Sequence, residues 1–453
     1  MPPFANRAGG RSVGHIRPSP AATGPSEPRA GAPGRLAIDA HLWFFYAAFR
    51  PHSADGIRPS IVFCLEISPR AVACSMIRRA ILHIGQSKTG TSSLQASLAR
   101  NRENLANEGL LYPDVSVGGM PIDIIAHNVV AESLIDIRRY PWLTKDEYFC
   151  QFADQCDRQG CDAILLSGES FFSTPHVWTL AEGHDYLALY RHKLEVLKSF
   201  LDGIESCTVV VYLRPQEDWF ESGVGHIIRY EGLLRRRIYE NDNQLFELLA
   251  PHMDYAALLG LWDEVLQPDK LVAVPYERER LIDRDVVRDF AARIGVPLDF
   301  DLAQSVREEN TSLDRRYLWL KNVLNRLDRD KNEERVIIDR LGTLNDRLSV
   351  RRKWVISDEL RERCRRRFAD SNDELAERFG IAPDPFFTPP PNSKTTDPIN
   401  ETEDGLAALM AFDHLYSAPS TRLFLARTRL ATRLRVGYPT LHTAAKRLVR
   451  LVS

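Results

Sequence analysis

A short, mostly apolar run that leads directly into a glycine-bounded polar loop constrains this chain more than any other feature. The run covers residues 80–84, and leucines recur at near-helical spacing from Ser92 to about Asn107. The loop between them carries small, hydroxyl-bearing and basic side chains. It reads Gly85-Gln86-Ser87-Lys88-Thr89-Gly90-Thr91-Ser92-Ser93. A buried strand, a tight loop and a helix are therefore predicted in direct succession.

The loop has the composition of an anion cradle. The first backbone N–H groups of a helix have no partner inside the helix and can point at a bound oxyanion. Gly85 and Gly90 permit a tight turn and a close approach to a ligand. Lys88 supplies a positive charge, and the hydroxyls after Gly90 supply donors. The phosphate loop of ATPases carries its lysine after the second glycine, whereas Lys88 precedes it.

Three further short apolar runs have the character of strands that are buried on both faces: residues 163–166, 208–213 and 271–274. Predicted helices separate them, at residues 186–201, 245–265 and 285–294. Strands that alternate with helices indicate crossover connections and hence a parallel sheet. Residues 313–380 are charged and helical in pattern, with no strand signal.

A second polar constellation follows the run that ends at Leu213. Arg214 stands at the predicted carboxyl end of that strand, where open α/β sheets bind ligands, and Pro215 suits the first turn of a helix. Ser222 would lie two turns along that helix. The guanidinium and the hydroxyl could meet on one phosphate. Alternatively, Arg214 pairs only with the acids that follow it, which are Glu217, Asp218 and Glu221.

These stretches resemble the PAPS-dependent sulfotransferases, and the bacterial and carbohydrate-type members in particular; PAPS is 3′-phosphoadenosine-5′-phosphosulfate. That family has a strand followed by a Lys-x-Gly-Thr-[Thr/Ser] loop, then a strand that ends in Arg with a Ser eight residues on. Residues 254–277 and 310–313 look like later stretches of the same family, so the match spans about residues 78–325. The resemblance implies a three-layer, P-loop-like α/β fold with a central parallel sheet and a helical C-terminal extension.

The resemblance also implies the function: transfer of a sulfuryl group from PAPS to a hydroxyl, of a carbohydrate or a glycolipid, with no metal. Lys88 would stabilise charge on the oxygen between phosphorus and sulfur, and Arg214 with Ser222 would bind the 3′-phosphate. The 5′-phosphosulfate would be held by Gly85, Lys88, Thr89, Gly90, Thr91, Ser92 and Ser93. The chain departs from the family in having Ser93-Leu94 where many members carry an adenine-stacking Trp, and in lacking the late Arg-Lys-Gly motif.

Two residues are candidates for the general base that accepts the proton of the acceptor hydroxyl. His127 follows the loop helix at a distance seen in histidine-using members of the family, and histidine titrates near neutral pH. Glu169 comes just after the run at 163–166, and a carboxylate in this role needs a raised pKa. Both assignments stay open on the sequence. The acceptor is expected to bind to variable loops at 112–160 and 223–250, the second of which carries Arg229, Arg235, Arg236 and Arg237.

Two other classes of function remain as alternatives. A P-loop-type kinase or NTPase would place a Mg²⁺-binding Asp at the end of a strand after the loop, where this chain offers Glu169 and Arg214 instead. A non-catalytic relative could bind nucleotide or glycan without transferring a group. The retention of Lys88, Arg214 and Ser222 argues against that alternative.

Composition sets the remaining expectations. A formal net charge of -2 gives no sign of a nucleic-acid partner, and the seven scattered cysteines indicate free thiols in a reducing cytoplasm. No apolar run approaches the roughly 18 residues of a membrane helix.

The expected organisation of the chain has five parts. A disordered segment rich in Pro and Arg covers 1–75, with Met76 as a candidate native start. The PAPS-binding domain covers 76–325 and a helical extension 326–382. A Pro-rich linker covers 383–402, and 403–453 forms basic amphipathic helices that could contact a membrane surface.

Overall fold

The computed structural model describes residues 77–117, 120–123, 125–135, 143–173, 185–234, 238–298, 312–327, 329–348 and 354–381. The segments expected at 1–75, 383–402 and 403–453 lie outside these residues, as do Arg235, Arg236 and Arg237. Within the described residues, no helix is long and apolar enough to cross a bilayer.

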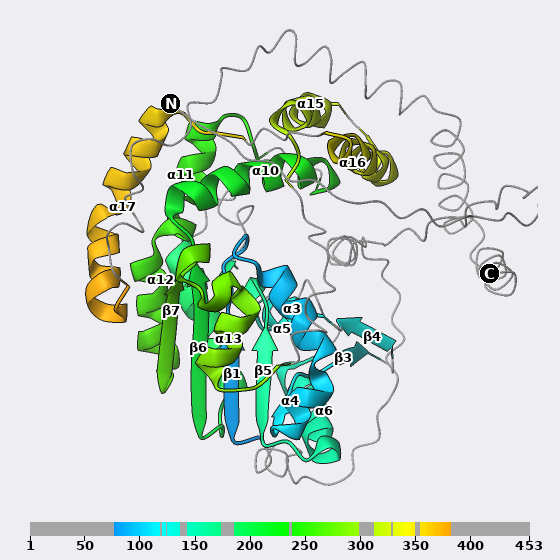
Figure 1. Ribbon diagram of the computed structural model, residues 1–453, viewed down its shortest axis with the longest axis vertical. Coiled ribbons are helices and arrows are strands. Elements are labelled where there is room, and N and C mark those ends of the chain that lie inside the picture. The colour runs from blue at the N-terminus through cyan, green and yellow to red at the C-terminus, as the bar shows by residue number, and fades with distance from the viewer. Residues whose placement is uncertain are drawn as a thin grey trace, which may run out of the picture. The chain divides into compact units, whose positions relative to one another are not determined.

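Five strands form the central sheet (Figure 1). They are β1 (Arg79–His83), β2 (Leu110–Leu111), β5 (Ala163–Ser167), β6 (Ser206–Leu213) and β7 (Lys270–Pro275). Their order across the sheet is β2-β5-β1-β6-β7, and every neighbouring pair is parallel. The predicted parallel sheet is therefore confirmed, with β1 at its centre. Because the strands are parallel, the loops that follow them meet at one edge. A separate antiparallel pair joins β3 (Val115–Val117) to β4 (Met120–Asp123).

Helices cover both faces of this sheet, which makes three layers. Leu82 of β1 faces one helical layer, and its neighbour Ile81 faces the other, as strand alternation requires. The first layer contains α5 (Asn128–Ile135), α6 (Lys145–Gln159), α9 (Tyr186–Phe200), α12 (Tyr255–Leu261) and a π-helical turn at Trp262–Leu266. The second layer contains α3 (Thr91–Arg100), α4 (Arg102–Asn107) and α13 (Val286–Ile294). The expected three-layer α/β fold is confirmed.

Two helices that the sequence predicts as continuous are interrupted. The predicted helix at 92–107 breaks at Asn101, whose Nδ2 donates to the Ser97 carbonyl at 2.9 Å. The predicted helix at 245–265 breaks at Asp254, where α11 (Asp242–Met253) ends and α12 begins. The Asp254 carboxylate accepts the Ala257 N–H at 3.2 Å and so caps α12. Both breaks occur at Asn or Asp, whose side chains compete with the helix for backbone hydrogen bonds.

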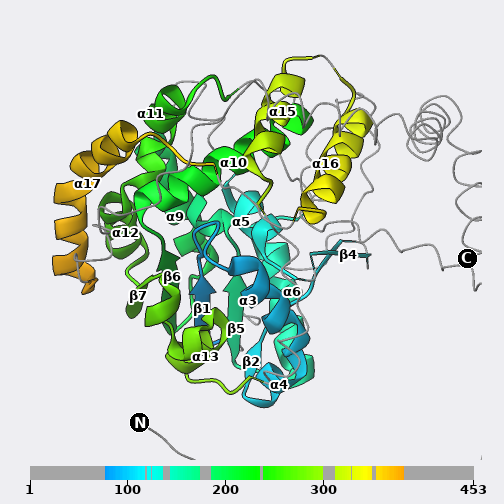
Figure 2. The same ribbon diagram turned by 45° about the horizontal axis from the view of Figure 1, so that its top comes forward.

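A second core consists of helices alone. It joins α11 to α10 (Gln216–Leu234), α15 (Arg315–Asn325), α16 (Lys331–Asp346) and α17 (Asp358–Phe379) (Figure 2). Phe220, Phe246 and Leu341 have no exposed surface there. A buried ion pair between Lys321 Nζ and Glu334 Oε2, at 2.9 Å, joins α15 to α16. Of these helices, only α16 and α17 lie in the stretch 326–382 that was expected as a helical extension, and both are helical there.

The expectation of loops at 112–160 and 223–250 is wrong for most of their length. Helix α6 occupies 145–159, and α10 and α11 occupy most of the second stretch. The physical reason is burial of apolar surface. Tyr148, Phe149 and Phe152 form one face of α6 and are almost entirely buried against the sheet. Two further helical turns, at Arg278–Arg280 and Ile282–Arg284, follow β7, and α7 (Ser170–Ser173) follows β5.

Candidate anion-binding site

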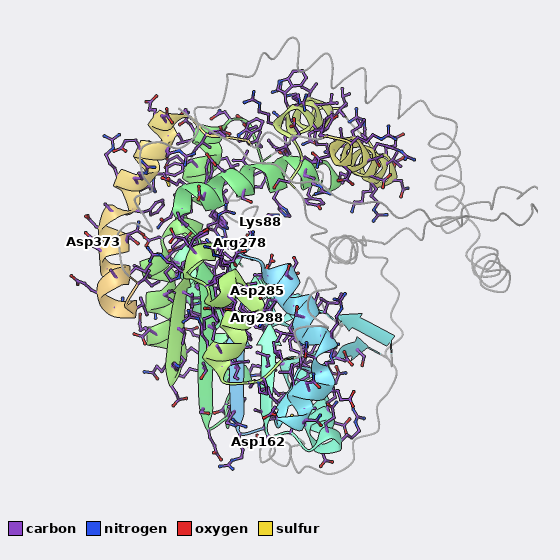
Figure 3. All side chains as sticks on the ribbon, in the orientation of Figure 1. Lys88, Asp162, Arg278, Asp285, Arg288 and Asp373 are labelled. Carbon is purple, nitrogen blue, oxygen red and sulfur yellow. The ribbon has the colours of Figure 1, made fainter. Side chains whose placement is uncertain are left out.

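The loop between β1 and α3, residues 85–90, is called the glycine loop below. It lies at the carboxyl edge of the sheet. Figure 3 shows Lys88 at that edge and Asp162, which precedes β5, at the opposite edge. Lys88 itself has a left-handed backbone with φ of 70°. This conformation costs a non-glycine residue about 1–2 kcal/mol, and such strain is concentrated at functional sites.

Both glycines of the loop are required by close contacts. A Cβ atom on Gly85 would lie 2.5 Å from Thr91 Cγ2, and one on Gly90 would lie 2.8 Å from the Tyr276 hydroxyl. Gly90 also has φ of 75°. It is the N-cap of α3 and has no side chain with which to cap that helix, whereas Ser357 caps α17 with its hydroxyl. The N–H groups in the first turn of α3 are therefore not taken by a capping side chain.

The hydroxyls of this segment divide into two kinds. Thr89 Oγ1 donates to the Gln86 carbonyl at 2.6 Å, and Thr91 Oγ1 donates to Glu169 Oε1. Both threonines are buried, and both hydroxyls are engaged by groups of the protein. Ser92 and Ser93, in the first turn of α3, are half-buried. Of the hydroxyls predicted to bind the donor, these two serines are the accessible ones.

Arg214 and Ser222 lie where the sequence predicts them. Arg214 is the first residue after β6, and Ser222 lies in the second turn of α10. Both are half-buried. Neither the Arg214 guanidinium nor the Ser222 hydroxyl forms a hydrogen bond or an ion pair with any residue that the structure describes. The alternative that Arg214 pairs with the acids of α10 is thus not found.

Those acids pair with helix α17 instead. Arg365 contacts both carboxylate oxygens of Glu217, at 2.8 and 2.9 Å, and Arg361 contacts Glu217 at 3.2 Å and also binds Glu221. We call Arg361 and Arg365 the arginine clasp. Burial raises the pKa of Glu221, against the influence of Arg361. Both glutamates are therefore engaged by α17, and neither pairs with Arg214.

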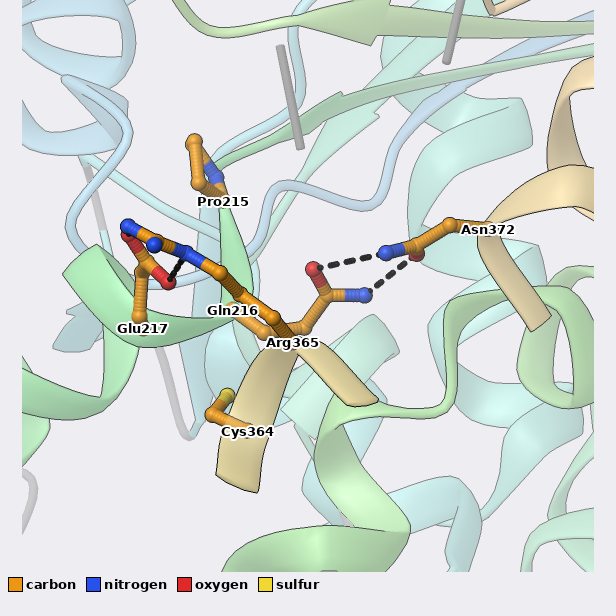
Figure 4. A pocket seen from close by; sticks show the side chains of 6 residues that line it. All are labelled: Pro215, Gln216, Glu217, Cys364, Arg365 and Asn372. Atoms are coloured by element: carbon orange, nitrogen blue, oxygen red, sulfur yellow. Dashed lines mark hydrogen bonds and ion pairs between the residues drawn. The ribbon is translucent and has the colours of Figure 1, made fainter. Parts of the chain in front are cut away.

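The start of α10 is further fixed by an amide pair. Gln216 Nε2 donates to Asn372 Oδ1 of α17 at 2.6 Å. Figure 4 shows this pair and the contact between Arg365 and Glu217, which lie on either side of a pocket. The pocket is lined by Pro215, Gln216, Glu217, Cys364, Arg365 and Asn372. Helix α17 therefore holds the segment that carries Arg214.

His127 is held by its own backbone surroundings. The side chain is 1% exposed, its Nε2 contacts the Pro113 carbonyl at 2.9 Å, and its Nδ1 accepts the Ser167 N–H at 2.9 Å. The ring is thus the Nε2–H tautomer, and burial lowers the pKa of His127 to about 4. With both nitrogens engaged, this geometry does not support His127 as the general base. It supports a role in fixing the end of β5.

Glu169 follows β5 at the carboxyl edge of the sheet, between Gly168 and the short helix α7. The side chain is half-buried and accepts the hydrogen bond from Thr91, so it lies beside the start of α3. The turn that carries it is fixed by Asn128, whose Oδ1 accepts the Ser170 N–H at 2.9 Å. This places a carboxylate adjacent to the glycine loop.

Two residues of the site have no role in the sequence prediction. Gln86 links the glycine loop to the backbone of Arg214, with its Oε1 2.9 Å from the Arg214 nitrogen. Trp219 of α10 donates from Nε1 to Ser87 Oγ at 3.3 Å. The only sequence signal for these roles was position: Gln86 lies inside the loop motif, and Trp219 lies about one turn after Arg214. In the part of the chain that the structure describes, no three His, Cys, Asp or Glu side chains are grouped to hold a metal ion.

Comparison with known proteins adds one distant likeness. No family model matches the chain, and no curated protein matches it. Among solved structures, the chain is similar to a sulfotransferase from Alicyclobacillus acidocaldarius, at 14% identity and a TM-score of 0.32. The match covers 67% of this chain and 96% of that one. A likeness of this degree carries no argument about the reaction, which depends on the site itself.

Proposed function

We propose that this chain is a PAPS-dependent sulfotransferase that transfers a sulfuryl group to a hydroxyl, of a carbohydrate or a glycolipid. One observation carries the proposal. A strained, lysine-bearing glycine loop and an arginine without a described partner lie at the same sheet edge and are joined through Gln86. Two separated positive groups fit a nucleotide with phosphates at both its 5′ and 3′ positions.

In the proposed reaction the oxygen of the acceptor hydroxyl attacks sulfur. The bond between sulfur and the 5′-phosphate oxygen breaks, and adenosine 3′,5′-bisphosphate leaves with that electron pair. Lys88 and the N–H groups of α3 stabilise the charge that develops on the leaving oxygen. Glu169 accepts the hydroxyl proton, which its position next to the loop supports.

A kinase or NTPase remains the second candidate because of one contact. The pair of Thr91 hydroxyl and Glu169 carboxylate resembles the Ser/Thr and acidic groups that hold Mg²⁺ in P-loop enzymes. The position of Lys88 before Gly90 disfavours this assignment.

Ligand-dependent thermal stability separates the two candidates. Adenosine 3′,5′-bisphosphate should raise the melting temperature of the full chain, and Mg-ATP should not. Lys88→Ala should remain folded, bind the bisphosphate more weakly and transfer label from PAPS roughly 10²–10³-fold more slowly. Stabilisation by Mg-ATP alone would assign the chain to the second class.

A further inference from the structure

The Gln86 side chain joins three elements at one point. Its Nε2 donates to the Tyr255 hydroxyl at 2.6 Å, and its Oε1 accepts the N–H of Arg214 at 2.9 Å. The Tyr255 hydroxyl in turn donates to the Arg214 carbonyl at 2.9 Å. We call this set of contacts, from Gln86 and Tyr255 to the backbone of Arg214, the glutamine latch.

Each polar side-chain atom of the latch has at least one hydrogen-bond partner. Gln86 is 1% exposed and Tyr255 has no exposed surface. The backbone N–H and carbonyl of Arg214 lie just beyond β6, and both are captured by these two side chains. Burial also raises the pKa of Tyr255, so that its hydroxyl keeps the proton that it donates. A buried network with all partners present has one low-energy arrangement.

Further hydrogen bonds connect Gln86 and its neighbour Ser87 to the rest of the glycine loop and to α10. The Gln86 carbonyl accepts the hydrogen bond from Thr89, and the adjacent Ser87 accepts the one from Trp219 of α10. The backbone of the loop and the backbone of Arg214 are therefore connected through one side chain. A shift of either would break hydrogen bonds in a place from which water is excluded.

We propose that Gln86 and Tyr255 are positioning residues that set the spacing between the glycine loop and Arg214. That spacing makes the site selective for a nucleotide with phosphates at both the 5′ and the 3′ positions. The inference rests on the proposed function, because it assumes that each end of the donor contacts one of these two groups. A nucleotide with a 5′-phosphate alone needs only the loop, so its binding does not depend on the latch.

The test compares adenosine 3′,5′-bisphosphate with adenosine 5′-monophosphate by isothermal titration calorimetry on the full chain. Tyr255→Phe removes one hydroxyl and keeps the ring. It should weaken binding of the bisphosphate about tenfold and that of the monophosphate less than twofold. In an Arg214→Ala background, Tyr255→Phe should have no further effect on the bisphosphate.

Tyr190→Phe is the matched control. Tyr190 is equally buried, and its hydroxyl accepts a hydrogen bond from Trp262 at 2.8 Å in the first helical layer. Tyr190→Phe should lower the stability of the chain without changing the ratio of its affinities for adenosine 3′,5′-bisphosphate and adenosine 5′-monophosphate. Gln86→Met provides a second latch variant should Tyr255→Phe not fold, with circular dichroism as the check.

The outcomes are distinguishable. If the wild-type chain does not bind the bisphosphate, the proposed function fails and the latch proposal with it. If the wild type binds it but both latch variants leave the affinity ratio unchanged, or weaken both ligands equally, the latch proposal alone is overturned.

Discussion

Lys88 occupies a left-handed backbone conformation that its own side chain does not favour, and the surrounding contacts hold it there. The Thr89 hydroxyl donates a hydrogen bond within the loop, and neighbouring atoms leave no room for a side chain at Gly85 or Gly90. His127 and Glu169 show that the neighbours of a side chain decide whether it can accept a proton from a substrate. The histidine has both ring nitrogens occupied, whereas the carboxylate lies beside the loop.

The first prediction separates these two residues. Glu169→Gln should lower the rate of sulfuryl transfer by roughly 10²–10⁴-fold, because the amide cannot accept the hydroxyl proton. Affinity for adenosine 3′,5′-bisphosphate should change little, since the amide can still accept the hydrogen bond from Thr91. Single-turnover transfer from labelled PAPS measures the rate. A Glu169→Gln enzyme with unaltered turnover would remove this residue from the reaction.

The second prediction concerns His127. His127→Gln should destabilise the chain by roughly 1–3 kcal/mol, because at least one buried backbone partner, Pro113 or Ser167, loses its hydrogen bond. The pH dependence of the residual transfer rate should keep its shape. Urea unfolding and a pH–rate profile together test this. Loss of transfer with unchanged stability would restore His127 as the base.

At the scale of elements, helix α17 decides whether a carboxylate of α10 can compete with a bound phosphate for Arg214. The arginine clasp takes the carboxylates of Glu217 and Glu221, which lie in the first two turns of α10. Glu217 is only 2% exposed, so without the clasp it would be a buried and uncompensated charge. Arg214, which lies three residues before Glu217 in the chain, is expected to become a replacement partner.

The third prediction follows from this competition. Arg365→Gln removes the contact to both carboxylate oxygens and leaves Glu217 with Arg361 alone, at 3.2 Å. Binding of adenosine 3′,5′-bisphosphate should then weaken about tenfold, because Glu217 becomes able to share its charge with Arg214. Adding Glu217→Gln should restore most of that affinity. Arg363→Gln is the control, since Arg363 lies on the same helix and pairs with the exposed Glu247. Equal affinities in Arg365→Gln and Arg363→Gln would exclude an influence of the clasp on the site.

At the scale of the whole molecule, two buried histidines couple the sheet to pH. His83, at the end of β1, has no exposed surface, and burial lowers its pKa to about 3; that of His127 is lowered to about 4. In the unfolded chain both would titrate near 6.5. Below that pH the unfolded state binds protons that the folded state does not, so stability falls as the pH falls from about 6.5 to 4.

The fourth prediction quantifies this dependence. Between pH 7.5 and pH 5, each histidine should cost the folded state about 2 kcal/mol of unfolding free energy. Together the two histidines should contribute nearly two protons to the slope of unfolding free energy against pH between pH 5 and pH 6, as urea unfolding measures it. His127→Gln should lower that slope by about one proton. A slope that the substitution leaves unchanged would contradict the assignment.

Much of this protein could be predicted from local sequence. The strands at β1, β5, β6 and β7 are apolar runs that only a sheet covered on both faces can bury, and the glycine loop follows from Gly85 and Gly90. The positions of Arg214 and Ser222 followed from the end of one strand. Strand β2 has only two residues and gave no periodic signal, and the helix at 145–159 was taken for a loop.

Contacts between distant segments were decided by tertiary structure alone. Gln86 and Arg214 are 128 residues apart, and Glu217 and Arg365 are 148 apart, so no local pattern connects them. The same holds for His127, whose partners Pro113 and Ser167 come from two other segments. Apolar periodicity specifies which face of an element is buried, but hydrogen-bond partners depend on which elements then pack together. The sequence by itself therefore determined the sheet and its loop, and the packing determined which charges and ring nitrogens remain available.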